Sequence, residues 1–107
     1  MPEQILERVA TRFRALGEVS RLRLIFSADK GKMNVTELIA ISGLSQANVS
    51  KHLRILTNAG LLIRQKKGIF VRYSTPGSTA SKLCALASAS LGVRSVGRPL
   101  PPVGDSS

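Results

Sequence analysis

The run GLSQANVSKHLRILTNAGLL, residues 43–62, separates apolar side chains from amide, hydroxyl and cationic ones, and it contains no carboxylate. Val49, Leu53 and Leu56 recur at i, i+4 and i+7, which predicts a helix with one buried stripe. At about 100° per residue, the remaining side chains point to the opposite side or to the flanks of that stripe. The candidates for binding are Ser45, Gln46, Ala47, Asn48, Ser50, Lys51 and Arg54.

Hydrogen bonding and charge pairing are the chemistry that these side chains offer. Gln46 can form two hydrogen bonds with the edge of an adenine, and Ala47 can contact a thymine methyl group. Lys51 and Arg54 are long enough to reach a phosphate or a guanine, and Ser50 suits a phosphate or a base edge. An ordinary solvated helix face is the alternative, but such a face usually carries charges of both signs. We therefore predict that this face contacts DNA.

The charge of the whole chain favours a polyanionic partner. Sixteen Lys and Arg residues face six Asp and Glu residues, which gives a formal net charge of +10. Five of the acids precede Leu38 and the sixth is Asp105, so the stretch between them carries no carboxylate. An excess of this kind favours DNA, RNA or an anionic membrane surface.

Nothing in the chain favours secretion or insertion into a membrane. Cys84 is the only cysteine, so no disulfide can form within the chain, and the first ten residues lack the order of a signal peptide. No apolar run approaches the roughly 20 residues that a membrane helix needs. We expect a cytoplasmic protein.

Apolar spacing and chain breakers predict the elements that position the binding face. The expected order is a helix over 5–16, a helix over 18–29, a short helix between Asn34 and Gly43, a helix between Ser45 and Gly60, a hairpin within 61–74 and a helix over 78–91. Asn34 and Glu37 have the spacing of a capping box, and Ser45 can cap the next helix.

Together these elements predict a mainly α domain with one two-stranded β-hairpin, a winged helix-turn-helix in the order α-α-α-α-β-β-α. We place this domain in residues 1–92 and predict that the Gly-, Pro- and Ser-rich residues 93–107 form a disordered tail. Within the second helix, Leu22, Ile25 and Phe26 are expected to face inward, and Arg21 and Arg23 are expected to be more exposed.

The hairpin carries four further candidates for DNA binding around a turn signal at Lys67-Gly68. These cations are Arg64, Lys66, Lys67 and Arg72. From a hairpin they can reach a neighbouring minor groove or a phosphate. They can also protect an exposed strand edge from aggregation, and one set of side chains can do both.

Two residues with reactive side chains have alternative interpretations. His52 lies beside the apolar stripe, and we expect it to be half-buried and hydrogen-bonded rather than a ligand or a proton switch. We expect Cys84 to be a small buried apolar residue in a dimer seam. The alternative for Cys84 is a redox-sensitive thiol that pairs with its copy across a two-fold axis.

The segments FRALGEVSRLRLI, VTELIAISGLSQANVSKHLRILTNAGLL and KKGIFVRYS together resemble the ArsR/SmtB family of bacterial winged-helix repressors. The resemblance runs from about Phe13 to Ser74 in unbroken order. It implies a homodimer, joined by its first and last helices, that represses an operon. It also implies release of the operator when an inducer binds, and in this family the inducer is often a metal ion.

The chain departs from that family at the positions that bind metals. Metal sensors of the family carry Cys or His ligands on the helix before the recognition helix, or Asp, Glu or His ligands on the last helix. Here the first segment reads NVTELIA, and the last helix offers only Cys84. Because a Zn²⁺ site needs about four ligands, we expect no metal. We also expect no cofactor and no dithiol sensor within one chain, and we predict no particular inducer.

The predicted function is sequence-specific DNA binding by a homodimeric repressor that reads an inverted-repeat operator. The alternative is a winged-helix interaction module that uses the same basic face for a protein, RNA or an anionic membrane. An enzyme is not expected, because the chain has no Gly-rich phosphate loop, no paired carboxylates and no nucleophile with a base nearby in sequence.

Overall fold

The structure, a computed structural model, describes residues 1–77 and 79–92. Its elements are α1 (Glu3–Leu16), α2 (Val19–Asp29), α3 (Val35–Ser42), α4 (Gln46–Asn58), β1 (Ile63–Lys67), β2 (Phe70–Ser74) and α5 (Thr79–Ser90). The predicted order of four helices, a hairpin and a fifth helix is confirmed. The tail predicted over 93–107 lies outside the described residues.

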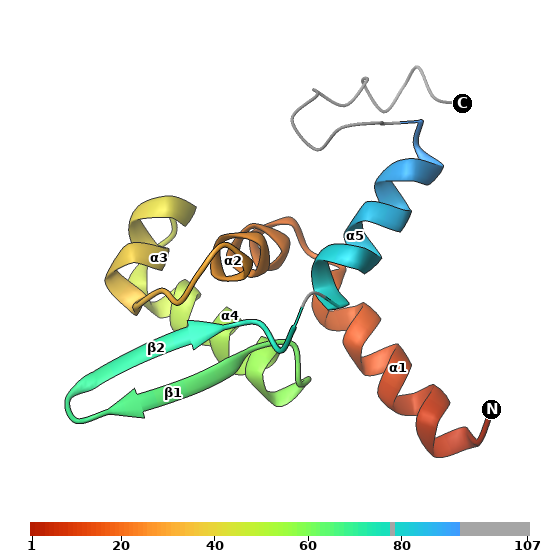
Figure 1. Ribbon diagram of the computed structural model, residues 1–107, viewed down its shortest axis with the longest axis horizontal. Coiled ribbons are helices and arrows are strands. Elements are labelled where there is room, and N and C mark those ends of the chain that lie inside the picture. The colour runs from red at the N-terminus through yellow and green to blue at the C-terminus, as the bar shows by residue number, and fades with distance from the viewer. Residues whose placement is uncertain (78, 93–107) are drawn as a thin grey trace.

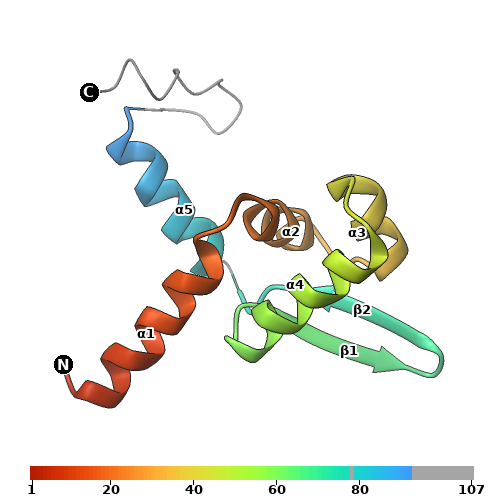
Figure 2. The ribbon, with the colours of Figure 1, turned by 180° about the vertical axis from the view of Figure 1, so that it is seen from behind.

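The core lies between α2, α3, α4 and the base of the hairpin. Its fully buried large side chains are Leu24, Ile25, Leu38, Val49, Leu53 and Leu56. The last three are the stripe predicted from the spacing along α4. Helices α1 and α5 lie at the end of the molecule opposite the tip of the hairpin (Figure 1), and Figure 2 shows α4 in front of the hairpin's base.

Polar caps set the ends of α3 and α4. The Asn34 side chain accepts a hydrogen bond from the N–H of Glu37 at 2.8 Å, and the Glu37 carboxylate accepts one from the N–H of Asn34 at 3.0 Å, which completes the predicted capping box. The Ser45 hydroxyl accepts a bond from the N–H of Asn48 at 3.2 Å and starts α4. Between the two helices, Gly43 has a left-handed conformation with φ of 69°, which glycine adopts without steric cost.

The start of α2 differs from the expectation. Glu18 caps the helix, and its carboxylate accepts hydrogen bonds from the N–H groups of Ser20 and Arg21, both at 3.1 Å. The bond from Ser20 is the main reason that the pKa of Glu18 is lowered. Arg21 is half-buried rather than exposed, because its side chain bonds to the end of α1. The fully buried Leu24 was not anticipated, whereas Phe26 is only half-buried.

The hairpin closes with a two-residue loop. Lys67 pairs with Phe70 across the antiparallel ladder, which leaves Gly68 and Ile69 in the loop. Gly68 has φ of 64°, the left-handed conformation that such tight turns favour. The turn therefore lies one residue beyond the Lys67-Gly68 signal.

Tyr73 attaches the hairpin to the core. Its side chain is buried, and its backbone N–H and C=O exchange hydrogen bonds with Met33 at 2.7 and 3.0 Å. This bridge makes the segment before α3 a second neighbour of β2. A lone hairpin is marginal in water, so this attachment is what allows the hairpin to project from the helices.

Asp29, the last residue of α2, holds the start of α5. Its carboxylate accepts a hydrogen bond from the Thr75 hydroxyl at 2.6 Å and another from the Ser81 hydroxyl. Both bonds favour the ionised carboxylate and lower the pKa of Asp29, with the bond from Ser81 as the larger cause. One carboxylate therefore connects α2, the end of β2 and α5.

This connection predicts an acid-sensitive attachment of α5. Because the pKa of Asp29 is lower in the folded chain than in the unfolded chain, its stabilisation is present above the unfolded-state value of about 3.9 and is lost as the pH falls through the folded-state value. Asp29→Ala should lower Tm at neutral pH and reduce the fall of Tm between about pH 5 and pH 3. Glu7→Gln, which changes an exposed acid of α1, is the control. Identical pH profiles for Asp29→Ala and the wild type would contradict the prediction.

Candidate nucleic-acid interface

The outward side of α4 is accessible along its length. All seven side chains that were predicted to bind DNA on this helix and its cap are exposed, namely Ser45, Gln46, Ala47, Asn48, Ser50, Lys51 and Arg54. The opposite side of the helix carries the buried stripe of Val49, Leu53 and Leu56. A rotation of α4 would bring these three out of the core, so the core itself determines which residues face outward.

The four hairpin cations divide between the two faces of the hairpin. Arg64 and Lys66 share the face of buried Tyr73, which packs toward the helices. Because side chains alternate along a strand, Lys67 and Arg72 lie on the outer face. All four cations are exposed.

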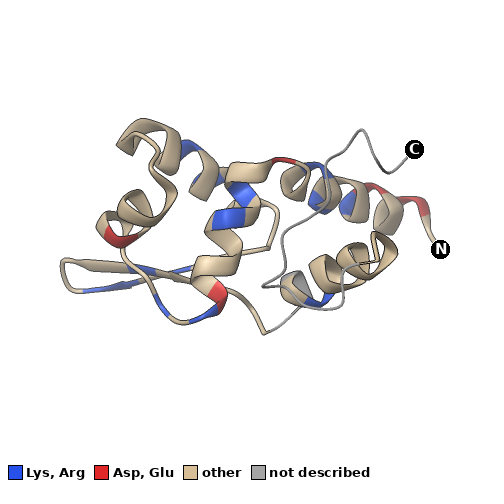
Figure 3. Cartoon of the chain, turned by 90° about the horizontal axis from the view of Figure 1, so that it is seen from above, with Lys and Arg blue, Asp and Glu red and all other residues tan. Residues whose placement is uncertain are grey.

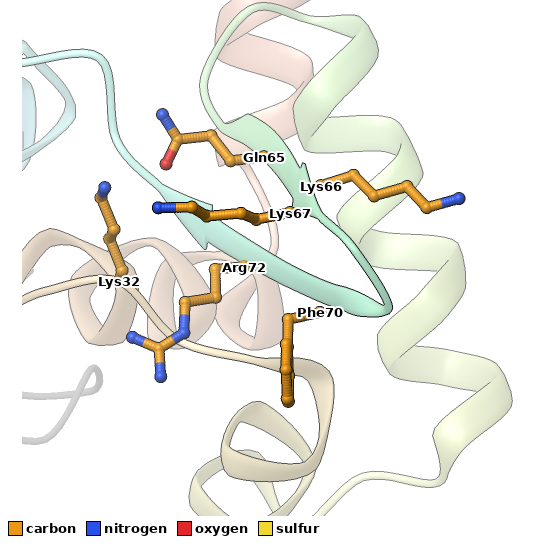
Figure 4. Close-up of a pocket in the computed structure, with 6 residues that line it drawn as sticks. All are labelled: Lys32, Gln65, Lys66, Lys67, Phe70 and Arg72. Carbon is orange, nitrogen blue, oxygen red and sulfur yellow. The ribbon is translucent and has the colours of Figure 1, made fainter.

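The outer face forms an open cleft of about 710 Å³ with the loop between α2 and α3 (Figure 4). Its lining consists of Lys32, Gln65, Lys66, Lys67, Phe70 and Arg72. Figure 4 shows Lys32 and Lys67 on the same side of the hairpin, with Lys66 directed to the other side, toward α4. Lys32 was not predicted from the sequence as part of this surface, because its position depends on the bridge that the next residue, Met33, forms with β2.

A second cleft, of about 280 Å³, lies between α4 and the hairpin, and we call it the α4–hairpin cleft. It is lined by Val35, Ser50, Leu53, Arg54, Thr57, Asn58, Arg64 and Tyr73. Two candidates from α4, Ser50 and Arg54, thus line the same cleft as one candidate from the hairpin, Arg64. The two groups of predicted residues form one accessible surface.

The cations of this surface keep their charge free for a partner. Within the described part of the chain, the one pair of basic and acidic side chains within 4.0 Å is His52 with Glu18, and no Lys or Arg has a carboxylate at that distance. Figure 3 shows acidic residues on α1, α2 and α3 but none on α4 or the hairpin. The described residues around the positive surface therefore do not neutralise it.

His52 lies on the flank of α4 that faces the start of α2. Its Nδ1 atom is 3.3 Å from Nη1 of Arg21, and its Nε2 atom is 3.7 Å from Oε2 of Glu18. A guanidinium group can only donate, so Nδ1 accepts and the proton of a neutral ring lies on Nε2, toward Glu18. His52 is half-buried and hydrogen-bonded, as expected. The sequence did not indicate its partners, since Arg21 lies 31 residues earlier.

Arg21 also holds the end of α1. Its Nε donates to the carbonyl oxygen of Ala15 at 2.6 Å, and its Nη2 donates to that of Arg14 at 3.4 Å. A cation is favoured at the carbonyl end of a helix by the free carbonyl groups and the helix dipole. One guanidinium group thus connects the end of α1, the start of α2 and the middle of α4.

Cys84 is half-buried in α5. Burial raises the pKa of its thiol. The thiolate is the reactive form of cysteine, so a raised pKa keeps this residue protonated near neutral pH. This favours the interpretation of Cys84 as a small apolar residue over that of a redox-sensitive thiol.

Among residues 1–77 and 79–92, no group of three or more His, Cys, Asp or Glu side chains is placed to hold a metal ion. No helix in these ranges has the length and apolar character needed to cross a bilayer.

Several bacterial regulators are similar to this chain over the same region. Residues 18–64 match the family described as "Bacterial regulatory protein, arsR family". The chain is 34% identical over 74 residues to the HTH-type transcriptional regulator NmtR of Mycobacterium tuberculosis, and the aligned region covers 69% of this chain and 62% of NmtR. It is 28% identical over 89 residues to the arsenical resistance operon repressor of Bacillus subtilis, and here the aligned region covers 78% of this chain and 85% of that protein. The chain thus spans less than two thirds of NmtR.

Solved structures share the fold over nearly their whole length. NolR from Sinorhizobium fredii matches with a TM-score of 0.75 at 27% identity, over 87% of this chain and 95% of NolR. The transcriptional repressor PagR of Bacillus anthracis matches with a TM-score of 0.71 at 26% identity, over 80% of this chain and 99% of PagR. With its helix-turn-helix, its hairpin and these relatives, the chain belongs to the ArsR family of bacterial regulatory proteins.

Proposed function

We propose that this chain is a transcriptional repressor that binds an inverted-repeat operator in double-stranded DNA as a homodimer. The observation that carries the proposal is the continuous accessible surface of α4 and the hairpin, which has no carboxylate of its own and whose cations have no carboxylate within 4.0 Å in the described residues. NmtR and the Bacillus subtilis protein are named as a transcriptional regulator and an operon repressor, which supports the same class of function here and not an enzyme.

Helix α4 is the element that we assign to the major groove. Gln46 and Ala47 lie in its first turn, where base edges are read, and they suit adenine and the thymine methyl group. Ser50, Lys51 and Arg54 lie farther along the exposed side and suit phosphates or guanine.

The amino-terminal end of α4 offers a contact of a second kind. Ser45 and Asn48 form its cap and are exposed. The free N–H groups and the dipole at a helix start favour an anion. We therefore assign these two residues to a backbone phosphate at the edge of the groove.

The hairpin extends the surface beyond α4. Arg64 and Lys66 point to the side of α4, so they suit the same stretch of duplex as the helix. Lys67 and Arg72 lie on the outer face together with Lys32, which makes that face a site for more distant phosphates. These cations add affinity without reading sequence.

Exposed apolar side chains of α1 and α5 supply the dimer seam. Leu6 and Phe13 on α1 are 46% and 57% exposed, and Leu86 on α5 is 70% exposed. The two helices lie at the same end of the fold, away from the hairpin tip (Figure 1). An exposed apolar patch of this kind marks an interface, and a second copy of the chain can cover it by two-fold symmetry. Such a dimer presents two α4 helices to half-sites about one helical turn apart.

The proposed function predicts a strong preference for a palindromic duplex. A palindrome selected by binding from randomised duplexes should bind far more tightly than a scrambled duplex of the same composition. If the dimer neutralises about six to ten phosphates, affinity should fall about 10³–10⁵-fold between 50 and 200 mM salt. Fluorescence anisotropy measures both effects, and equally weak binding of the two duplexes would contradict the proposal.

A matched pair of variants separates specific electrostatic contact from total charge. Lys51→Gln removes a cation from the exposed side of α4 and should reduce the salt dependence by about one ion per subunit. Lys82→Gln removes an exposed cation of α5 and should leave the salt dependence unchanged.

The dimer seam predicts a monomer when a charge is placed in it. Phe13→Asp should shift the chain from dimer to monomer in sedimentation equilibrium, because a buried unpaired carboxylate is strongly unfavourable. Ile41→Asp changes another exposed apolar residue, on α3, and should leave the dimer intact. A dimer of unchanged strength in Phe13→Asp would show that α1 is not in the seam.

The contacts of Arg21 predict that it positions α4 without touching DNA. Arg21→Lys cannot reach the carbonyl groups of α1 and His52 at once, since lysine lacks the planar fork of arginine. Operator affinity should fall about tenfold while the slope of affinity against salt stays unchanged. Arg23→Lys, an exposed neighbour on α2, is the control. A reduced salt slope in Arg21→Lys would instead indicate a direct phosphate contact.

A further inference from the structure

One buried hydroxyl group in the α4–hairpin cleft has no hydrogen-bond partner among residues 1–77 and 79–92. Oγ1 of Thr57 is covered, and it is the one side-chain nitrogen or oxygen in this state within the described residues. Buried polar atoms are nearly always hydrogen-bonded, because an unmet bond destabilises the folded chain. A helical threonine can bond to the carbonyl group four residues earlier, which here belongs to Leu53, but Thr57 does not.

Thr57 lies on the flank of α4 that faces the hairpin. At about 100° per residue, Ser50, Arg54 and Thr57 fall in one sector of the helix, and all three line the cleft together with Arg64 of β1. Tyr73 adds a third hydroxyl group to the lining, which contains no carboxylate. Two arginines and three residues with hydroxyl groups therefore line one small cleft.

This set of donors suits a tetrahedral oxyanion. Guanidinium groups bind phosphate oxygens through paired, charge-assisted hydrogen bonds. Neither Arg54 nor Arg64 has a carboxylate within 4.0 Å in the part of the chain that the structure describes. An anion between them would compensate both charges, and a nearby hydroxyl group would donate to a remaining oxygen.

We propose that the α4–hairpin cleft binds an oxyanion of the phosphate class, with Arg54 and Arg64 closing on it and the Thr57 hydroxyl donating to it. Because Oγ1 is covered in the free protein, binding includes a local shift of the residues that line the cleft. The unmet hydroxyl is then a group retained for binding at the expense of stability.

The oxyanion can come from two sources. One is a backbone phosphate of the operator, and in that case the inference rests on the proposed function and adds a contact near the end of α4. The other is free phosphate or a phosphorylated small molecule, which would occupy the cleft without DNA and compete with it. The chemistry of the site is the same for both.

Thr57→Val and Thr57→Ser are the matched variants for this test. Valine keeps the shape of threonine and removes only the hydroxyl, whereas serine keeps the hydroxyl. Thr57→Val should raise the Tm of the free full-length chain, because it removes an unmet polar group. The same variant should weaken oxyanion binding about tenfold, while Thr57→Ser binds as the wild type does. A merely structural role would not move stability and binding in opposite directions.

The first experiment tests free phosphate. Tm of the DNA-free chain is measured in sodium phosphate and in sodium chloride at equal ionic strength. A ligand that binds only the folded chain raises Tm. A greater rise of Tm in phosphate than in chloride for the wild type and Thr57→Ser, reduced in Thr57→Val, would identify free phosphate as a ligand of the cleft.

The second experiment tests the operator backbone. Duplexes in which one phosphate at a time is replaced by a neutral methylphosphonate are titrated with the wild type and Thr57→Val. At the phosphate that occupies the cleft, the methylphosphonate should lower the affinity of the wild type. It should lower the affinity of Thr57→Val only slightly further, because the methylphosphonate and the loss of the hydroxyl remove the same contact. Such a position would identify the backbone as the source.

Either signal supports the site and names its source. The inference is overturned if neither experiment gives a signal in the wild type, or if Thr57→Val binds phosphate and every duplex as the wild type does. A chain that gives the free-phosphate signal without preferring a palindromic duplex would keep the site and lose the proposed repressor function, so the two failures are distinguishable.

Discussion

Burial of one side of α4 is the constraint on which the rest of the interface depends. Val49, Leu53 and Leu56 are almost completely covered by the core, and burying a side chain of this size contributes about 1.5–3 kcal/mol. Turning the helix by one residue, about 100°, would expose this stripe. The same packing therefore stabilises the domain and decides that Gln46 and Lys51 face outward.

Polar contacts then divide the remaining surface of α4 into flanks with different neighbours. On one flank His52 meets Arg21, which also bonds to the last carbonyl groups of α1. On the other flank Arg54 lines the same cleft as Arg64 of the hairpin, whose base is attached through Tyr73 and Met33. The helix proposed to read bases is thus connected on one side to a helix of the proposed dimer seam and on the other to the hairpin.

Several features of this surface lower the stability of the free chain. Its cations lack carboxylate partners in the described residues, and like charges in a compact domain repel each other. The hydroxyl of Thr57 is buried and has no hydrogen-bond partner in the part of the chain that the structure describes. The unpartnered hydroxyl and two of these cations occur together in the α4–hairpin cleft, although neither feature stabilises the fold. A bound polyanion would reduce the charge repulsion and accept a hydrogen bond from the hydroxyl.

The sequence by itself determined the helices, the caps of α3 and α4, the hairpin and the outward set on α4, because periodicity, cap spacing and turn residues act between near neighbours in the chain. It did not determine the half-buried position of Arg21, the place of Lys32 beside the hairpin or the cleft around Thr57. Each of these depends on contacts between segments far apart in the chain, such as Arg21 with His52. Only tertiary packing decides them, since no local pattern records which distant side chains will meet.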